Sequence, residues 1–397
     1  MKLFLLTVLL LLAPFSPAED SSLRRLDGTR ISIAEAESTA RNILTQNHVT
    51  GAQIAILNHG RVVWSFAFGL RDRAQNLPMQ TTTTTWAASI TKGAFGVYVM
   101  QLVEQNQLSL DEPIARLLPQ PLDHYDPYRN TAADLVHDPR WLAVTPRMLL
   151  SHTSGLANFV FLEPDKKIHL HFAPGSSFAY SGEGLNLLQF VIEQRLHQPL
   201  DQLMQQALFT PLGMTQTSML WQPRFAADVA DRYDLNENFI VHTRRDRPRA
   251  AGSMTTSVED LARFTSALMD GRILKPASLH TMLTPVVRID RVRQFPTFDQ
   301  PKGTEGSAVG LAYGIGWGLL THTRFGPAFF KEGHGEGAQN YMICFTSHRD
   351  CMILLTNSDN GELAFRPLLE AIFGDTVTPW KWESYDHEGI LASRKNQ

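Results

Sequence analysis

Cysteine is scarce in this sequence, whose 397 residues include only Cys344 and Cys351. Neither belongs to a C-x-x-C motif or to a cluster of metal-ligating residues, so the pair points to structural rather than redox or metal chemistry. The two cysteines flank a predicted turn at 347–350. Two interpretations stay open: a disulfide between facing positions of a hairpin, or two buried thiols in adjacent strands.

An excess of basic residues is also missing. The 36 lysines and arginines are balanced by 39 aspartates and glutamates, which gives a formal net charge of -3. The sequence contains no block rich in lysine and arginine and interleaved with aromatic residues, so nucleic acid is not expected as a partner. With 43% hydrophobic and 19% charged residues, the composition is that of an ordinary globular protein.

Long apolar runs are confined to the N-terminus. Residues 1–18 combine a positive charge at Lys2, an apolar stretch from Leu3 to Leu12 and a small residue at Ala18, the pattern of a cleaved secretory signal peptide. The stretch is too short for a stable membrane span. We therefore expect a periplasmic or secreted protein with no membrane contact after cleavage. An uncleaved N-terminal anchor is the alternative.

Strand patterns gather at the two ends of the chain. A helix and a β-hairpin are predicted near the N-terminus, and several strands followed by a helix near the C-terminus. These elements are a helix over 31–46, strands at 52–57, 61–68, 314–320, 338–345 and 351–357, and a helix over 362–373. The region between them is mainly helical, with predicted helices at 93–105, 184–195, 200–207 and 258–269.

This distribution predicts an α/β (α+β) fold with an antiparallel sheet built from both chain ends, flanked by helices, and a mostly α-helical inserted domain. The predicted units are a signal peptide at 1–18, a discontinuous sheet domain at 31–85 and 311–374, a mainly helical domain with loops at 86–310, and a C-terminal tail at 375–397.

Three further segments carry expectations. Long loops are predicted at 120–140 and 294–310; loops of this length either shape binding sites or are surface insertions with no role. In the C-terminal tail, Trp380 and Trp382 are expected to pack on the body of the protein rather than to contact a partner.

The candidate chemistry begins at Ser89, which is followed by Lys92 on a predicted helix that continues to Gln105. This spacing places the lysine one turn into the helix on the same face as the serine. A serine hydroxyl becomes a nucleophile when a neighbouring base takes its proton, and a helix N-terminus stabilises the anion. The G-x-S-x-G motif does not occur, so the hydrolase fold built on that turn is not supported.

Other polar residues offer partners for this serine. Tyr180 precedes a predicted helix and is a candidate proton carrier near Lys92, and His334 lies in a glycine-rich entry into a strand. For His152 a hydrogen-bonding role that braces its loop is favoured over a role as base. His169 and His171 suggest a metal site, but a third ligand at a defined spacing is missing.

Four stretches together resemble one family. Ser89-Ile-Thr-Lys92, the segment from Thr145 to Leu156 that contains Leu-Leu-Ser-His-Thr-Ser-Gly, Pro174-Gly to Tyr180-Ser-Gly182, and Gly333-His-Gly-Glu-Gly337 occur in this order. They are similar to the motifs of the class C β-lactamase family, which includes D-Ala-D-Ala carboxypeptidases, D-aminopeptidases and carboxylesterases. The resemblance covers about 33–374 and implies a β-lactamase/transpeptidase-like fold.

The resemblance also implies roles for single residues. Ser89 would be the acylated nucleophile, Lys92 its cationic partner and Tyr180 the general base, although which of the two takes the first proton stays open. His334 would head the third motif and orient the substrate. The oxyanion hole would use the backbone N–H of Ser89 and that of Gly337.

Two departures from the family pattern concern the substrate. Gly182 stands where the second motif commonly has an asparagine that contacts a substrate amide, and Glu336 stands where the third motif would have its glycine. Both argue against efficient β-lactam hydrolysis and leave ester or peptide hydrolysis open. They also motivate the alternative of a catalytically silent penicillin-binding or cell-wall-binding protein.

The resulting prediction is an exported serine hydrolase that acts on an ester or amide, peptide or β-lactam-like, through a Ser89 acyl-enzyme. It needs no cofactor and no metal, and its partner is a small-molecule or peptide substrate. A metal-dependent hydrolase centred on His169 and His171 is the third hypothesis. The oligomeric state is not predicted.

Overall fold

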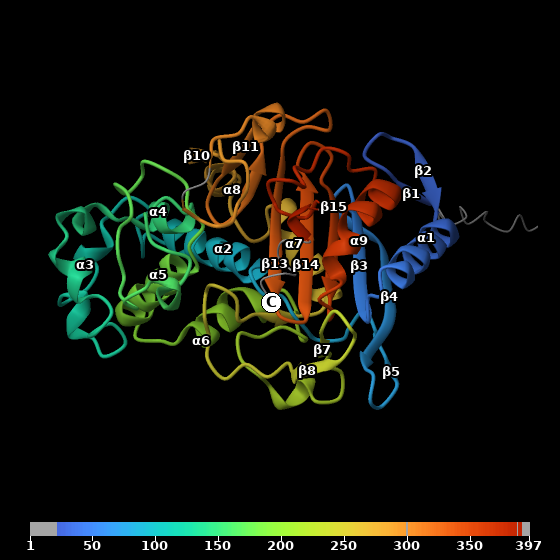
Figure 1. The fold of residues 1–397 in the computed structure, drawn as a ribbon, viewed down its shortest axis with the longest axis horizontal. Coiled ribbons are helices and arrows are strands. Elements are labelled where there is room, and N and C mark those ends of the chain that lie inside the picture. Colours follow the sequence, from blue (N-terminus) through green and yellow to red (C-terminus); the bar gives the residue numbers. More distant parts are fainter. Residues whose placement is uncertain (1–21, 299–300, 387, 391–397) are drawn as a thin grey trace, which may run out of the picture.

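The fold is organised around one large antiparallel sheet that joins the two ends of the chain (Figure 1). The computed structural model describes residues 22–298, 301–386 and 388–390, so the predicted signal peptide lies outside the described residues. The nine strands follow the order β10-β11-β12-β13-β14-β15-β3-β4-β5. They are β3 (Gly51–Asn58), β4 (Arg61–Asp72), β5 (Leu77–Pro78), β10 (Val287–Arg288), β11 (Leu311–Tyr313), β12 (Gly318–Leu320), β13 (Ala328–Gly335), β14 (Ala338–Phe345) and β15 (Asp350–Thr356).

Helices cover both faces of this sheet (Figure 1). On one face α1 (Ile33–Gln46) contacts β4, and α9 (Gly361–Leu368) contacts β14. On the other face α7 (Val258–Met269) contacts β3, β4 and β15, while α2 (Ile90–Glu104) contacts β13 and β14. The central strands are buried along their whole length, which explains their nearly continuous apolar sequences. Each face of the sheet therefore borders its own hydrophobic core.

A helical region lies beside the sheet, at the left of Figure 1. It contains α3 (Ala133–His137), α4 (Pro146–Leu150), α5 (Gly182–Leu196), α6 (Leu200–Met204) and α8 (Pro276–Met282). Short strand pairs complete the fold: β1 (Ser22–Arg24) with β2 (Arg30–Ser32), β6 (Thr85–Trp86) with β9 (Thr255–Thr256), and β7 (Asp231–Tyr233) with β8 (Phe239–His242). The β6–β9 pair fixes the backbone that enters α2.

The predicted fold class is confirmed: helices flank a large antiparallel sheet made from both chain ends. Two predictions in the C-terminal half were wrong. Of the strand expected over 314–320, only 318–320 is a strand, β12, because the chain turns at 314–317 after β11. The structure also contains a strand that the prediction missed, β13, which pairs with β14 along its whole length. Three elements of the 86–310 segment, α2, α7 and β10, belong to the sheet or pack against it.

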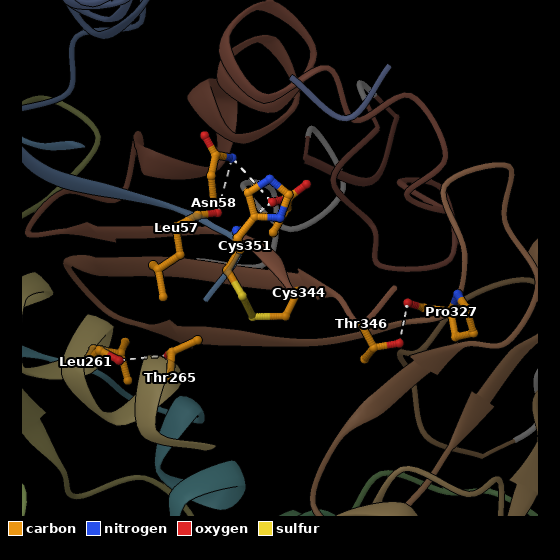
Figure 2. Close-up of a disulfide and its surroundings, with 10 residues drawn as sticks. Leu57, Asn58, Leu261, Thr265, Pro327, Cys344, Thr346 and Cys351 are labelled. Carbon is orange, nitrogen blue, oxygen red and sulfur yellow. Dashed lines mark hydrogen bonds between the residues drawn. A yellow bond between two sulfur atoms is a disulfide. The ribbon is translucent and has the colours of Figure 1, made fainter. Parts of the chain in front are cut away.

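The two cysteines form a disulfide across the β14–β15 hairpin (Figure 2). Cys344 and Cys351 are directly opposite in the strand register, and their Cα atoms are 4.1 Å apart. Both side chains are fully buried. Of the two interpretations that the sequence left open, the structure shows the bonded one.

The C-terminal tail packs on the sheet side of the molecule, as predicted. Trp380 and Trp382 are buried, and the Trp382 carbonyl accepts a hydrogen bond of 2.8 Å from the backbone N–H of Gln294. The tail thus holds the start of the 294–310 segment close to β13. Among the described residues, no helix is long and apolar enough to cross a membrane.

Candidate active site

Ser89 stands at the start of α2, where the backbone is strained. Ala88, directly before it, has a positive φ of 45°, which is uncommon for a residue other than glycine and typical of functional turns. The Ser89 side chain makes no capping hydrogen bond to the helix and is only partly buried. Its hydroxyl is therefore available for chemistry rather than for helix capping.

Lys92 lies directly behind this hydroxyl. Its side chain is 1% exposed, and its Nζ is 2.8 Å from Ser89 Oγ and 2.5 Å from the carbonyl oxygen of Ala251. Burial, and after it the charge of Lys331, holds the pKa of Lys92 well below its usual value, and the opposing charge of Glu332 does not restore it. A buried amine with a low pKa has a lone pair that can accept the serine proton.

Tyr180 completes the arrangement. Lys331 Nζ donates to its hydroxyl at 3.0 Å, and Lys92 Nζ lies over its ring, 5.1 Å from the centroid. Burial, followed by the charge of Glu332, raises the pKa of Tyr180 well above its usual value, while a hydrogen bond with Ser89 acts in the opposite direction. Tyr180 therefore keeps its proton at neutral pH.

His152 has a hydrogen-bonding role, as predicted, but it braces the segment that carries Tyr180. Its Nδ1 accepts the backbone N–H of Ser181 at 3.1 Å, and its backbone carbonyl accepts that of Ala179 at 2.8 Å. The imidazole ring packs against the Tyr180 ring with centroids 4.3 Å apart. Burial, and then the charges of Lys92 and Lys331, lowers the pKa of His152 well below its usual value, so the ring stays neutral.

The third motif lies three residues earlier than the sequence analysis placed it. Lys331, not His334, has its amino group at the Tyr180 hydroxyl, and the Lys331–Glu332–Gly333 sequence follows the Lys-x-Gly pattern. Lys331 is fully buried and pairs with Glu332 Oε1 at 2.6 Å. Gln294 Nε2 donates to the same oxygen at 3.2 Å. Burial raises the pKa of Glu332, but Lys331 and Gln294 outweigh it and leave this pKa lowered.

Gly333 brings the motif into contact with the nucleophile segment. A Cβ atom at this position would collide with the carbonyl oxygen of Ala87, two residues before Ser89. The Asn340 side chain ties the same region together, because its Nδ2 donates to the carbonyls of Trp86 and Gly333. Only glycine allows β13 to approach Ser89 this closely.

The edge of β13 offers a backbone donor at His334. Its partner in the register, Gln339, directs its own N–H and C=O toward Thr356 on β15. In an antiparallel pair of this kind, the opposite residue directs its backbone groups away from the shared ladder. The strand beyond, β12, ends its pairing at Phe330. The N–H of His334 therefore points to an unpaired edge of the sheet, on the side where Gly333 meets Ala87.

The assignment of an oxyanion donor to Gly337 is wrong. Its N–H donates to Asp359 Oδ1 at 2.6 Å, so it is not available to a substrate. The imidazole of His334 also turns away from Tyr180 and bonds Glu362 at 2.7 Å. Glu336 lies in the turn between β13 and β14 and not in the third motif. The glycine that seemed to be missing from this motif is Gly333.

Gly182 begins α5, and an aromatic ring occupies the space of a side chain there. An added Cβ would lie 2.6 Å from the Phe159 ring. The backbone N–H of Gly182 donates to Asn158 Oδ1 at 2.9 Å. An asparagine projecting from position 182, as in the family pattern, would collide with Phe159. The wall next to Tyr180 is therefore apolar at this point.

The two histidines proposed as metal ligands do not share a site. His169 Nε2 bonds Asp165 at 2.9 Å, and His171 Nε2 bonds Glu163 at 2.7 Å. His169 and Asp165 lie near Asp134 in an exposed group, but Asp134 already pairs with Lys167 at 2.8 Å. The geometry gives the metal-hydrolase hypothesis no support.

Sequence reasoning thus brought Ser89, Lys92 and Tyr180 together correctly in space, but it missed Lys331, Glu332 and Gln294. The signal for Lys331 was present: a lysine and a glycine two residues apart follow Phe329-Phe330, an apolar run typical of a buried strand. Recognition of β13 as a strand would have placed that motif. Nothing in the sequence indicated that Gln294 would reach Glu332.

Comparisons with known proteins agree with this geometry. A family model described as Beta-lactamase matches residues 36–374. Penicillin-binding protein 4* of Bacillus subtilis is 22% identical over 363 residues, which span 83% of this chain and 72% of that protein. Esterase EstB of Burkholderia gladioli is 30% identical over 221 residues, 48% of this chain and 53% of that protein.

Solved structures show the same fold. The octameric penicillin-binding protein homologue of Pyrococcus abyssi superposes with a TM-score of 0.68 at 21% identity and covers 92% of this chain and 81% of its own. Since the family model spans the whole sheet and the helical region, and the serine, lysine and tyrosine of the family motifs meet at one place, this chain belongs to the Beta-lactamase family of serine hydrolases.

Proposed function

We propose that this protein hydrolyses a carboxylic ester through an acyl-enzyme on Ser89. The observation that carries the proposal is the 2.8 Å approach of Lys92 Nζ to Ser89 Oγ, with a lysine that is buried and has a lowered pKa. A solvated lysine at the same distance would be an ammonium ion without a free lone pair. Burial changes this residue from a cation into a base.

In this proposed mechanism Lys92 is the first base. As Ser89 Oγ bonds to the ester carbonyl carbon, its proton passes to Lys92 Nζ, while one amine hydrogen stays bonded to Ala251 O. Tyr180 is the weaker candidate for this step, since its raised pKa keeps it protonated. A base that is neutral near working pH suits such a transfer.

Tyr180 then serves as the acid. When the bond between the carbonyl carbon and the leaving oxygen breaks, the tyrosine hydroxyl supplies the proton that the alcohol needs. Lys331 donates to the tyrosine oxygen at 3.0 Å and stabilises the negative charge that develops there. The proton held by Lys92 restores the hydroxyl, and a water molecule repeats the sequence to release the acid.

The carbonyl oxygen would be held by two backbone donors, the N–H of Ser89 at the start of α2 and that of His334 on the open edge of β13. Fixed dipoles of this kind stabilise the charge that develops in the transition state, and the loss of one typically costs about 3 kcal/mol. This arrangement keeps the predicted Ser89 donor and replaces Gly337 with the backbone of His334.

The contacts at Gly182 favour an ester over a β-lactam. Phe159 fills the place from which an asparagine amide would reach a substrate amide, and the partial relative EstB is an esterase by name. Glu336 lies outside the third motif. One of the two observations that suggested a catalytically silent binding protein therefore no longer applies. The complete set of Ser89, Lys92, Tyr180 and Lys331 supports turnover.

We also propose that the protein is exported. The N-terminal 1–18 segment has the composition of a signal peptide, and the Cys344–Cys351 disulfide suits an oxidising compartment. These two features are independent of each other and agree.

Ser89→Ala should abolish ester hydrolysis. The purified wild-type protein should hydrolyse p-nitrophenyl butyrate and gain one fluorophosphonate adduct in intact-mass spectrometry, mapped to Ser89, whereas Ser89→Ala should do neither. Ser307→Ala serves as the matched control, because Ser307 lies on a different segment, beside β11. Unchanged hydrolysis in Ser89→Ala would refute the proposed mechanism. Rapid turnover of a penicillin would contradict the preference for esters.

The kcat/KM for a neutral ester should rise with pH and reach a plateau at a pH below the usual pKa of lysine. Below its folded pKa, Lys92 carries a proton and cannot accept another; above that pKa it is a free amine, and this pKa is well below the usual value of lysine. Lys92→Met should lose at least about 100-fold in kcat/KM. The exposed Lys302→Met is the control. A kcat/KM that falls as the pH rises toward this plateau would contradict Lys92 as the base.

Gly333→Ala should be folded but nearly inactive. The new Cβ would collide with the carbonyl oxygen of Ala87, push β13 away from Ser89 and misplace the His334 N–H. We expect kcat to fall about 100-fold, as for loss of an oxyanion donor, and denaturant unfolding to show a cooperative transition. Gly28→Ala tests general destabilisation, because the added Cβ meets no atom there and the strain comes from the positive φ of 85° at that position. Wild-type activity in Gly333→Ala would exclude this edge from the site.

The exported protein should begin at Glu19. Expression with the native N-terminus in a bacterium, followed by fractionation and N-terminal mass spectrometry, should find the cleaved chain in the periplasm or medium, because Ser16-Pro17-Ala18 precedes the expected cut. A membrane-bound chain that still begins at Met1 would instead identify an uncleaved N-terminal anchor.

A further inference from the structure

Two arginines share one tryptophan ring close to the nucleophile. The guanidinium carbons of Arg232 and Arg245 lie 4.7 Å and 3.9 Å from the centroid of the Trp86 ring. Trp86 belongs to β6 and comes three residues before Ser89. Arg232 comes from β7, and Arg245 follows β8. The β7–β8 hairpin and the chain after it therefore bring two positive charges to the same ring.

No carboxylate within the described ranges forms an ion pair with either arginine at 4.0 Å or less. Arg232 donates through Nη1 to the backbone carbonyl of Glu336 at 2.7 Å, and its buried Nε has no hydrogen-bond partner among the described residues. Burial, and then repulsion from Arg245, lowers the pKa of Arg232 to about 10. Two like charges that are partly desolvated in this way gain from a nearby anion.

The nearest acidic groups do not fill this role. Glu336 and Asp359 favour the charged form of Arg232, and Asp246 favours that of Arg245, but only at longer range. Asp359 already accepts the N–H of Gly337 and that of the Gln339 side chain. Among the described residues, these carboxylates thus act on the positive charge beside Trp86 from beyond ion-pair distance.

Trp86 ties these arginines to the catalytic centre. Its indole Nε1 donates to the carbonyl of Gly252 at 2.6 Å, and the preceding carbonyl, that of Ala251, binds Lys92 Nζ. On its other side, Gly335 leaves room for the Trp86 ring, since a Cβ there would collide with it. The ring that carries the two guanidinium groups is therefore in contact with both walls of the proposed site: the 251–252 backbone and the edge of β13.

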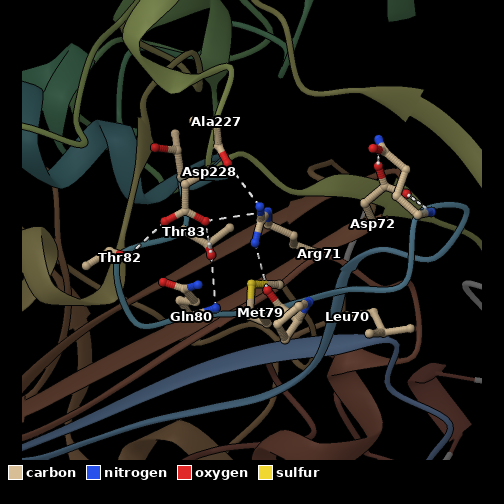
Figure 3. A network of polar contacts seen from close by, with 12 residues as sticks. Leu70, Arg71, Asp72, Met79, Gln80, Thr82, Thr83, Ala227 and Asp228 are labelled. Carbon is tan, nitrogen blue, oxygen red and sulfur yellow. Dashed lines mark hydrogen bonds and ion pairs between the residues drawn. The ribbon is translucent and has the colours of Figure 1, made fainter.

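A polar network fixes the chain that delivers Arg232. Figure 3 shows Asp228, which accepts from the hydroxyls of Thr82 and Thr83 at 2.8 Å and 2.6 Å. Arg71 donates to the Ala227 carbonyl at 2.9 Å in the same network. Backbone bonds then link the strand entering β6 to the strand entering β7, with Ala230 N–H donating to the Thr84 carbonyl. The position of Arg232 relative to Trp86 is thereby set by the fold and not by a free loop.

We propose that Arg232 and Arg245 form an anion subsite that binds a carboxylate on the substrate, away from the ester bond that is cleaved. The inference rests on the proposed ester hydrolysis and specifies its substrate class: an ester that carries a second, negatively charged group. Paired guanidinium groups recognise a carboxylate through charge-assisted, often bidentate hydrogen bonds. The carboxylate belongs either to the acyl part or to the alcohol part of the ester, and the two cases are separated by experiment.

The test uses two matched pairs of esters. Mono-(p-nitrophenyl) glutarate against p-nitrophenyl butyrate places the charge on the acyl part, and 3-(butanoyloxy)benzoate against phenyl butyrate places it on the alcohol. We expect the wild-type protein to prefer the anionic member of one pair by at least about tenfold in kcat/KM. Arg245→Gln should reduce that preference at least about tenfold through KM and leave hydrolysis of the neutral ester within about twofold.

Two further variants sharpen this test. Arg245→Lys keeps the positive charge but loses the bidentate guanidinium group, and should retain part of the preference for the anionic ester. Arg244→Gln is the matched control, because Arg244 neighbours Arg245 in sequence but its guanidinium lies over Trp221 and not over Trp86. Arg244→Gln should leave both members of each pair unchanged. An equal loss in Arg244→Gln and Arg245→Gln would reduce the effect to general surface charge and overturn the subsite.

A binding measurement separates this inference from the proposed reaction. Glutarate titrated into Ser89→Ala should bind, and should bind at least about tenfold more weakly to Ser89→Ala/Arg245→Gln, whether or not the wild-type protein turns over an ester. Absence of glutarate binding together with equal rates for the anionic and neutral esters would refute the subsite while leaving the hydrolase intact. Binding without any ester hydrolysis would refute the hydrolase while supporting the subsite.

Discussion

The site depends on the exclusion of water from one amino group, that of Lys92. A lysine in water is a cation at any physiological pH and cannot accept the proton of Ser89. Here the residue is 1% exposed, and its neighbours include a second buried lysine, Lys331. Both features disfavour the ammonium form. Burial of such a group costs stability, because the unfolded chain gains a proton that the folded chain does not hold. The fold bears this cost through the core that surrounds α2.

The two buried lysines are treated differently by their surroundings, and this difference assigns their roles. Lys331 is paired with Glu332 at 2.6 Å, and Gln294 supports the same carboxylate. Within the described part of the chain, the Lys92 amino group has no carboxylate at ion-pair distance and bonds Ser89 Oγ and the carbonyl of Ala251. Burial lowers the pKa of both lysines, and the charge of Glu332 opposes this in both, but at Lys331 a direct hydrogen bond with Glu332 adds to that opposition. One lysine is thereby suited to accept a proton, and the other to stabilise the Tyr180 oxygen.

The sequence was sufficient to predict the parts of this site that depend on local spacing. Ser89 and Lys92 are one helical turn apart. The strands of the β3–β4 hairpin have hydrophobic patterns that are typical of β-strands. It was not sufficient where a contact depends on strand register. Both Gly333 and Gly337 could be the glycine of the third motif by sequence. The pairing of His334 with Gln339 shows that the N–H after Gly333, that of His334, faces the open edge. A shift of three residues in one motif exchanged an available donor for one bound to Asp359.

Register also relates the proposed anion subsite to the nucleophile. The open edge of β13 runs from the Lys331 amino group, past Gly333 at the nucleophile segment, to Gly335 against Trp86. At the catalytic end, burial holds the pKa of Lys92 well below its usual value, and Lys331 is paired with Glu332. At the Trp86 end two guanidinium groups are not balanced by a carboxylate at ion-pair distance among the described residues. In a chain whose formal net charge is -3, this local positive field comes from the fold, and a substrate lying along the edge would meet it with the end remote from the reacting carbonyl.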